Sequence, residues 1–421
     1  MSAVAYLGGS GALAVALLAL AYGSRHLRRL VVPAWSGALA GVAEVVLGLS
    51  MLTVVLELTG LVGQLRPGVV MVAVPLVAVA AGLIARRRAR PAPPPPDPPA
   101  GPRWEVIAGF VLAAVVFAQW LAHAGVIMEG GLRDMDSLRY HGPFAARWVQ
   151  QHSLIHLQHT SSEVQETFFP ANAELLHAYG ILLFGRDVLT PVLNLGWYGF
   201  GVLVAWAAPI SARGRAAAVA GFAALCSTPL IASIEPGSAK NDLAAAVLVI
   251  GLAAFLLHRG DDDRGPLLLA GLAAGLAVGT KLTVLVPVLV LVLGAVWLTP
   301  ARRGRAVATL LGAATLTGSF WYLRNLVHTG NPLPWLQHLG PISLPAPAMP
   351  GPAAHGFSVL HYATDGSFWA HVVPDGLHRS FGPLFPVLLG GAAGLALLSL
   401  VGRRVPAPAR LVAGAALAGM A

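Results

Sequence analysis

The chain has 421 residues, of which 56% are hydrophobic and only 11% charged, and its mean hydropathy is +0.72. So apolar a composition excludes a soluble protein built on one core and indicates a membrane protein with many spans. The net charge of +9 comes largely from arginines at the ends of apolar runs, which is typical of cytoplasmic loops and argues against a nucleic-acid partner. Because these runs are continuous, they predict helices and not the alternating strands of a barrel.

The first 90 residues predict a unit of three spans. Residues 3–23 are apolar and follow no basic region, so we expect a retained first span and not a cleaved signal peptide. Two further spans are expected over residues 36–63 and 68–85, after which a cluster of arginines would lie in the cytoplasm. The proline-rich stretch 91–103 predicts an extended cytoplasmic linker.

Residues 104–421 predict the remaining spans, which gives about 11 to 12 in total for runs of this length. Two long segments, 128–187 and 326–383, are expected on the outer face. Residues 266–298 have arginines on both flanks, so they must cross an even number of times, which predicts a hairpin divided at Gly279-Thr280-Lys281. The arms are short, which places Lys281 at the membrane boundary. The chain stops within an apolar run, and we expect a truncated C-terminus.

Many ionisable residues fall on the predicted outer face, where several spans would bring them together. They are Asp134, Asp136, Arg139, His141, Glu235, Lys240, Asp242, Lys281 and Arg324. Lys240 and Lys281 are the only lysines in the chain. Ionisable groups at membrane depth are costly and usually have a partner or a function. Carboxylates beside cations at the mouth of a helical bundle can accept a proton and neutralise a phosphate.

Several motifs in this part of the chain carry a family resemblance. The sequence Asp136-Ser137-Leu138-Arg139-Tyr140-His141, with Trp148 and Phe169-Pro170-Ala171-Asn172-Ala173-Glu174-Leu175-Leu176, resembles the first outer loop of GT-C membrane glycosyltransferases. These enzymes use polyprenyl-phosphate sugars, and the chain looks most similar to their protein O-mannosyltransferase and aminoarabinose transferase branch. Further similarities, within residues 104–340, are Ser238-Ala239-Lys240-Asn241-Asp242, Gly279-Thr280-Lys281, Tyr322-Leu323-Arg324-Asn325 and Gly330-Asn331-Pro332.

The resemblance implies a role for each matching residue. The family's first-loop acidic residue is its catalytic base, which falls on Asp136 by motif position. Asp134 is the second candidate, because this chain has Ser137 where many relatives have another acidic residue. By the same resemblance Asp242 is a supporting carboxylate. The expected phosphate-binding residues are Lys281, Arg324 and Lys240, and the expected substrate-binding residues are Arg139, Tyr140 and His141. A divalent cation, Mg²⁺ or Mn²⁺, held by Asp136 and Asp242 stays open, since only some GT-C enzymes use one.

The function implied is transfer of a sugar from a polyprenyl-phosphate donor to an acceptor hydroxyl on the outer side of the cell membrane. A single displacement at the anomeric carbon would invert its configuration, with a carboxylate taking the acceptor proton. The expected partners are the lipid-linked sugar, the bilayer and a glycan, lipid or protein acceptor. The alternative is a multi-pass secondary transporter or a flippase for lipid-linked sugars, although the chain shows no inverted repeat.

Several of these residues also have purely structural interpretations. Asp134 and Asp136 could solvate a loop, Asp242 could cap the helix that it begins, and Arg324 could anchor a span at the interface. Glu44, in the middle of a predicted span, favours a buried ion pair or a protonated carboxyl. His152, His156 and His159 would share one face of a helix with the spacing of metal ligands, but a chance pattern on a solvated helix is the favoured interpretation.

Overall fold

The computed structural model of the chain describes residues 2–88, 102–160, 166–260, 264–347, 362–402 and 404–420. Helices make up almost all the regular structure in these ranges, so the predicted all-helical class is confirmed. One small antiparallel hairpin is the exception, and it pairs β1 (His338–Leu339) with β2 (Ile342–Ser343). The predicted linker 91–103 lies, except for its last two residues, outside the described residues.

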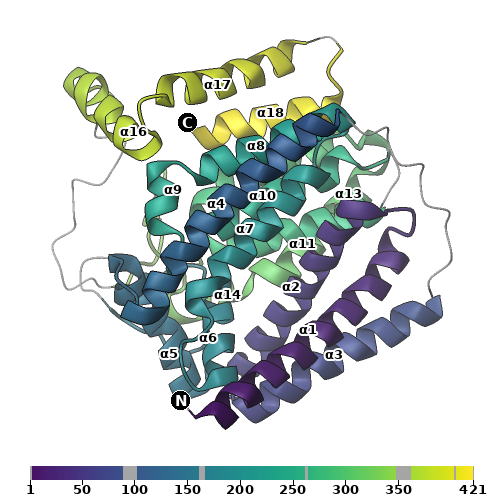
Figure 1. The fold of residues 1–421 in the computed structure, drawn as a ribbon, viewed down its shortest axis with the longest axis vertical. Helices are drawn as coiled ribbons and strands as arrows, with labels where there is room; N and C mark the ends of the chain where they lie inside the picture. Colours follow the sequence, from purple (N-terminus) through teal and green to yellow (C-terminus); the bar gives the residue numbers. More distant parts are fainter. Residues whose placement is uncertain are drawn as a thin grey trace.

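The first half begins with four long helices and continues with shorter ones. They are α1 (Ala3–Val31), α2 (Gly37–Leu61), α3 (Pro67–Arg88), α4 (Arg103–Gly130), η1 (Ser137–His141), α5 (Gly142–Gln151), η2 (Glu166–Phe168), α6 (Asn172–Phe184) and α7 (Thr190–Ala207). In Figure 1, α1, α2 and α3 run side by side along one flank of the molecule.

The second half consists of shorter helices. They are α8 (Ala212–Cys226), α9 (Pro229–Ile234), α10 (Asp242–Leu257), α11 (Arg264–Thr280), η3 (Leu282–Val284), α12 (Leu285–Trp297), η4 (Pro300–Arg302), α13 (Arg303–Gly318), α14 (Phe320–Thr329), η5 (Phe368–Val372), α16 (Val373–Phe381), α17 (Phe385–Val401) and α18 (Ala407–Met420). Helices α16 to α18 lie on the flank opposite α1 and α3 in Figure 1.

Four helices, α1 to α4, are long and apolar enough to cross a membrane. The number rises to six if two bent pairs each count as one span: Leu282–Trp297 with Pro300–Gly318, bent by 88°, and Phe368–Phe381 with Phe385–Val401, bent by 94°. Helices of this length and composition among the described residues indicate a membrane protein. The predicted total of about 11 to 12 spans stays a prediction.

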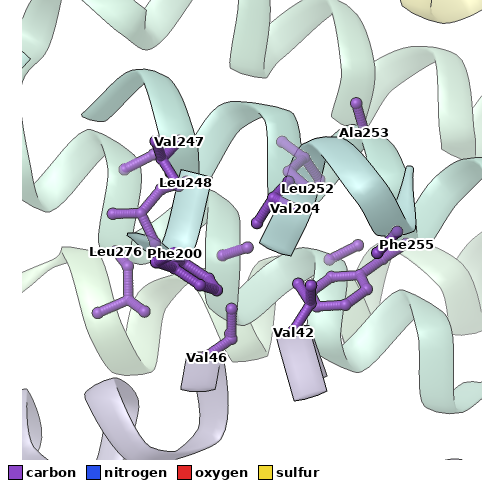
Figure 2. Packing of buried hydrophobic residues seen from close by; sticks show 14 of the residues in the cluster. Val42, Val46, Phe200, Val204, Val247, Leu248, Leu252, Ala253, Phe255 and Leu276 are labelled. Atoms are coloured by element: carbon purple, nitrogen blue, oxygen red, sulfur yellow. The ribbon is translucent and has the colours of Figure 1, made fainter. Parts of the chain in front are cut away.

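The main core lies where α2 meets helices from the middle of the chain, among them α7, α10 and α11. Val42 and Val46 of α2 pack in one cluster with Phe200 of α7 and Leu248 of α10 (Figure 2). Of its apolar window, α2 buries 56%, whereas α1 and α4 each bury 22%. Helix α2 is therefore central, and the N-terminal helices share a core with the rest of the bundle.

Helices α11 and α13 approach each other closely through small residues. A Cβ on Gly275 would lie 2.2 Å from Thr317 Oγ1, and one on Gly318 would lie 2.5 Å from the Gly275 carbonyl oxygen. Such contacts let two backbones pack without intervening side chains, as is common between membrane helices. The Thr317 carbonyl also accepts a hydrogen bond from Asn172 Nδ2 at 2.9 Å, which fixes the start of α6 against this helix pair.

Arginines collect at one end of the bundle, which we call the arginine end. Arg259 donates to the carbonyls of Ala295 and Leu298 where α12 finishes, and three further arginines line a small pocket there, namely Arg264, Arg302 and Arg305. The backbone of Val31, which ends α1, touches Gly265 at the same end. Near it Arg28 pairs with Glu44 at 3.1 Å, so of the two alternatives for Glu44 the structure shows the ion pair, although the side chains are partly exposed and not fully buried.

One local prediction was wrong. Helix α5 ends at Gln151, and His152 has the left-handed φ of 57°, so His152, His156 and His159 do not share a helix face. By contrast, α11 ends at Thr280 and a new helical turn begins after Lys281, as the predicted hairpin requires.

The side of the membrane that each end faces can be tested by cysteine labelling. The native Cys226 is fully buried, so wild-type background labelling should be low. We expect His338→Cys, in the β hairpin, to react with a membrane-impermeant maleimide on intact cells. Ala301→Cys, at the arginine end, should react only after permeabilisation, because arginine-rich loops stay inside. The reverse pattern would contradict the predicted orientation.

Candidate functional site

The end of the bundle opposite the arginine end holds nearly all the predicted site residues, and we call it the carboxylate end. Four segments meet there: residues 134–141, the start of α6, the turn 235–242 before α10, and Lys281 between α11 and η3. They are joined by direct contacts across the bundle, since Ser137 Oγ accepts the Ala239 backbone N–H at 2.7 Å. The predicted convergence of these distant segments is therefore present in the structure.

Local sequence explains how the 134–141 segment is presented. Gly131, with a φ of 79°, ends α4 in a conformation that favours glycine. Asp134 Oδ1 then accepts the backbone N–H of Ser137 at 2.9 Å, as an N-cap does at the start of a helix. Asp134 therefore has a structural role, whereas the side chain of Asp136 is directed to a lysine.

The first ion pair joins Asp136 to Lys240. Lys240 Nζ lies 2.5 Å from Asp136 Oδ2, and the side chains are 15% and 40% exposed respectively. Burial alone would raise the pKa of Asp136, but the hydrogen bond and charge of Lys240 outweigh it, helped by the charges of His141 and Lys281, and the pKa lies below its ordinary value. The same pair raises the pKa of Lys240 against the effect of burial. Both groups are therefore charged at neutral pH.

The turn that carries Lys240 is held by glycine and by a buried asparagine. Gly237 has a φ of 76°, and a Cβ there would lie 2.7 Å from the Ile127 side chain. Asn194 Nδ2 donates to Glu235 Oε2 at 3.1 Å and to the Lys240 carbonyl at 3.2 Å. Burial, aided by the charge of Asp242, raises the pKa of Glu235 to about 8, so this carboxyl is mostly neutral at pH 7.

The second ion pair joins Asp242 to Lys281. Lys281 Nζ lies 2.7 Å from Asp242 Oδ1 and donates to Asn241 Oδ1 at 3.1 Å. The Lys281 side chain is 26% exposed and that of Asp242 is 43% exposed, so both can reach a bound molecule. Asp242 is also the first residue of α10, where a carboxylate is stabilised by the helix dipole. The N-cap position belongs to Asn241, whose side chain makes no capping hydrogen bond, so the structure shows an ion pair for Asp242 and not the helix cap that the sequence suggested.

Behind the two pairs lies a buried network that sequence analysis did not assign. Glu174 Oε1 lies 2.5 Å from His141 Nδ1, and both side chains are 2% exposed. Asn241 Nδ2 donates to the same oxygen at 3.2 Å. Glu174 stood in one of the motifs that carry the family resemblance, and its place in the first turn of a short, apolar helix was the available signal.

A pocket of about 280 Å³ opens beside this network. Its polar lining includes Glu174, Asn241 and Lys281, and its aromatic wall consists of Tyr140, Phe169 and Trp335. The Phe169 and Trp335 rings lie edge to face, with centroids 5.9 Å apart. An apolar pocket with a few converging polar groups is the usual form of a small-molecule site, and this one is just below the typical range of about 300 to 1,000 Å³.

Of the remaining predicted residues, Tyr140 lines the pocket, whereas Arg139 and Arg324 have mainly structural contacts. Arg139 Nε pairs with the buried Glu166 at 2.9 Å, and the ring of Tyr140 lies 4.0 Å from that of His141. Arg324 is 6% exposed, donates to the Thr167 carbonyl and lies 4.8 Å from the centre of the Trp321 ring. Arg324 does not line the pocket. Its predicted phosphate contact therefore stays a prediction.

The residues present do not form a metal donor set. Among the described residues, no group of three or more His, Cys, Asp or Glu side chains could hold an ion. Asp136 and Asp242, the two carboxylates expected to share one, each pair with a lysine instead.

Comparison with protein-family models, with curated proteins and with solved structures finds no match to this chain.

Removing Lys240 should change the protonation of Asp136. In Lys240→Met the burial of Asp136 is no longer opposed by its main partner, so we expect its pKa to rise. This can be followed by ¹³C NMR of aspartate-labelled protein in detergent, with the Asp136 signal assigned by its loss in Asp136→Asn. Lys281→Met is the matched control and should raise the pKa less, because Lys281 contributes only through its charge. An unchanged titration in Lys240→Met would contradict the assigned pairing.

Proposed function

We propose that the chain is a membrane glycosyltransferase of GT-C type. It takes a sugar from a polyprenyl-phosphate donor on the outer side of the cell membrane and passes it to an acceptor hydroxyl. The observation that carries the proposal is the placement of the only two lysines, each paired with a candidate carboxylate at one end of the bundle. Lys281 lines an aromatic pocket there.

The proposed step is a single displacement at the anomeric carbon. The acceptor oxygen forms a bond to this carbon while the bond from the carbon to the phosphate oxygen breaks. Asp136 takes the acceptor proton, for which its ionised form is required. The polyprenyl phosphate leaves with the bonding electrons and gains negative charge, which Lys281 neutralises within the partly closed pocket. The configuration at the anomeric carbon is inverted.

The lysine pairs support this division of roles. Lys240 keeps Asp136 ionised and oriented. Because Lys240 lowers the pKa of Asp136, it also makes this carboxylate a weaker base. The phosphate of the donor would compete with Asp242 for Lys281, and Asp242 is exposed enough to remain solvated when displaced. An ammonium held in advance needs little reorganisation when charge develops on the leaving group. The pocket size suits one sugar with its phosphate, and the polyprenyl tail would remain in the bilayer.

The direct test is transfer of radiolabelled sugar from polyprenyl-phosphate donors to acceptors in membranes that contain the chain. We expect Asp136→Asn to lower the rate by about 10² to 10⁴, the usual contribution of a general base. Asp134→Asn should keep most of the activity, because Asp134 serves as a helix cap and asparagine also caps helices.

Three outcomes would overturn parts of the proposal. Normal transfer by Asp136→Asn would remove Asp136 as the base, and loss of transfer only in Asp134→Asn would exchange the two roles. Absence of transfer from every donor tested, with movement of the lipid-linked sugar across the membrane, would replace the enzyme with a flippase.

A further inference from the structure

The buried carboxylate of Glu174 has no part in the displacement described above, yet it occupies a costly position. Its side chain is 2% exposed and it lines the pocket. Burying a carboxylate is tolerated only when charged or polar partners compensate it. Glu174 Oε1 receives two such partners, His141 Nδ1 at 2.5 Å and Asn241 Nδ2 at 3.2 Å. The chain thus retains, next to the pocket, a carboxylate whose burial is energetically unfavourable.

The Asn241 amide connects this carboxylate to Lys281. Its nitrogen donates to Glu174 Oε1 and, at 3.3 Å, to the Thr280 carbonyl, while its oxygen accepts from Lys281 Nζ at 3.1 Å. An amide has one donor end and one acceptor end, so fixing the nitrogen also fixes the oxygen. If the amide turned over, its N–H groups would face the ammonium of Lys281 and repel it. The acceptors at Glu174 and Thr280 therefore together determine which end Lys281 meets, and Glu174 is the charged one of the two.

We propose that Glu174 is a positioning residue that acts through Asn241 to hold the Lys281 ammonium where the donor phosphate binds. The inference rests on the proposed function, since it takes Lys281 as the phosphate ligand. Glu174 itself touches no reacting atom. His141 completes the arrangement from the other side, because its hydrogen bond keeps the Glu174 oxygen directed toward Asn241.

A purely structural role for Glu174 predicts different behaviour. If Glu174 only satisfied buried groups, its removal would destabilise the protein and weaken every ligand contact regardless of Lys281. If it acts through Asn241, its effect on phosphate binding must disappear once Lys281 is gone. A double-mutant cycle measures this difference, because residues coupled through one network give non-additive effects.

The experiment measures the dissociation constant of radiolabelled polyprenyl phosphate for the full chain in detergent micelles. The variants are Glu174→Ala, Lys281→Met and the double variant. We expect Glu174→Ala to weaken binding roughly tenfold, the loss expected for one charge-assisted hydrogen bond. In the Lys281→Met background the same change should have no further effect. Asn241→Leu should reproduce the loss without removing the buried carboxylate, which covers the case in which Glu174→Ala does not fold.

Glu44→Ala is the matched control, because it removes a paired carboxylate at the arginine end and should leave binding unchanged. Equal losses from Glu174→Ala in both backgrounds, or normal binding by Asn241→Leu, would overturn the positioning role while leaving the proposed function standing. Failure of the wild-type chain to bind polyprenyl phosphate would overturn the proposed function itself, and this inference with it.

Discussion

Two lysine–carboxylate pairs, Asp136 with Lys240 and Asp242 with Lys281, determine how the carboxylate end is built. Charged groups at the mouth of a membrane bundle are expensive unless they are paired, and removing one partner leaves the other uncompensated. Each pair joins segments that are far apart in the chain. The segment after α4 must therefore meet the turn before α10, and the tip of the α11–α12 hairpin must meet the start of α10. The packing of glycine against backbone between α11 and α13 holds this hairpin in place.

The two pairs differ in a way that suits different tasks. Lys240, the partner of Asp136, is 15% exposed and comes from a turn fixed by Gly237 and Asn194, so this pair is held rigidly. Lys281 is more exposed, lines the pocket and is shared between Asp242 and Asn241. A carboxylate that must stay ionised, as proposed for Asp136, benefits from a rigid pair. An ammonium that must exchange its partner for a ligand, as proposed for Lys281, benefits from a more exposed pair.

The sequence was sufficient to predict the all-helical class, the break between helices at Lys281 and the convergence of residues 134–141 with residues 240–242 and Lys281. The two membrane crossings on either side of that break stay a prediction. These features follow from hydropathy and from the arginine pattern, which are properties of whole segments. The partners of individual charges could not be predicted, because the choice between Lys240 and Lys281 for Asp136 depends on turn geometry at Gly237. Glu174 was overlooked as a site residue for the same reason: its importance comes from His141 and Asn241, which lie 33 and 67 residues away. The spacing of His152, His156 and His159 predicted a shared helix face. This was wrong because α5 ends at Gln151, and the spacing of the histidines does not show where the helix ends.

The central claim is that the aromatic pocket at the carboxylate end receives the lipid-linked sugar. It is tested most directly by photo-crosslinking, with a benzophenone amino acid in place of Trp335 in one variant and of Ala301, at the arginine end, in another. The account predicts that a radiolabelled polyprenyl-phosphate sugar is captured at position 335 and not at 301, and that excess unlabelled polyprenyl phosphate prevents the capture. Capture at 301 alone, or capture at 335 that excess polyprenyl phosphate does not reduce, would contradict it.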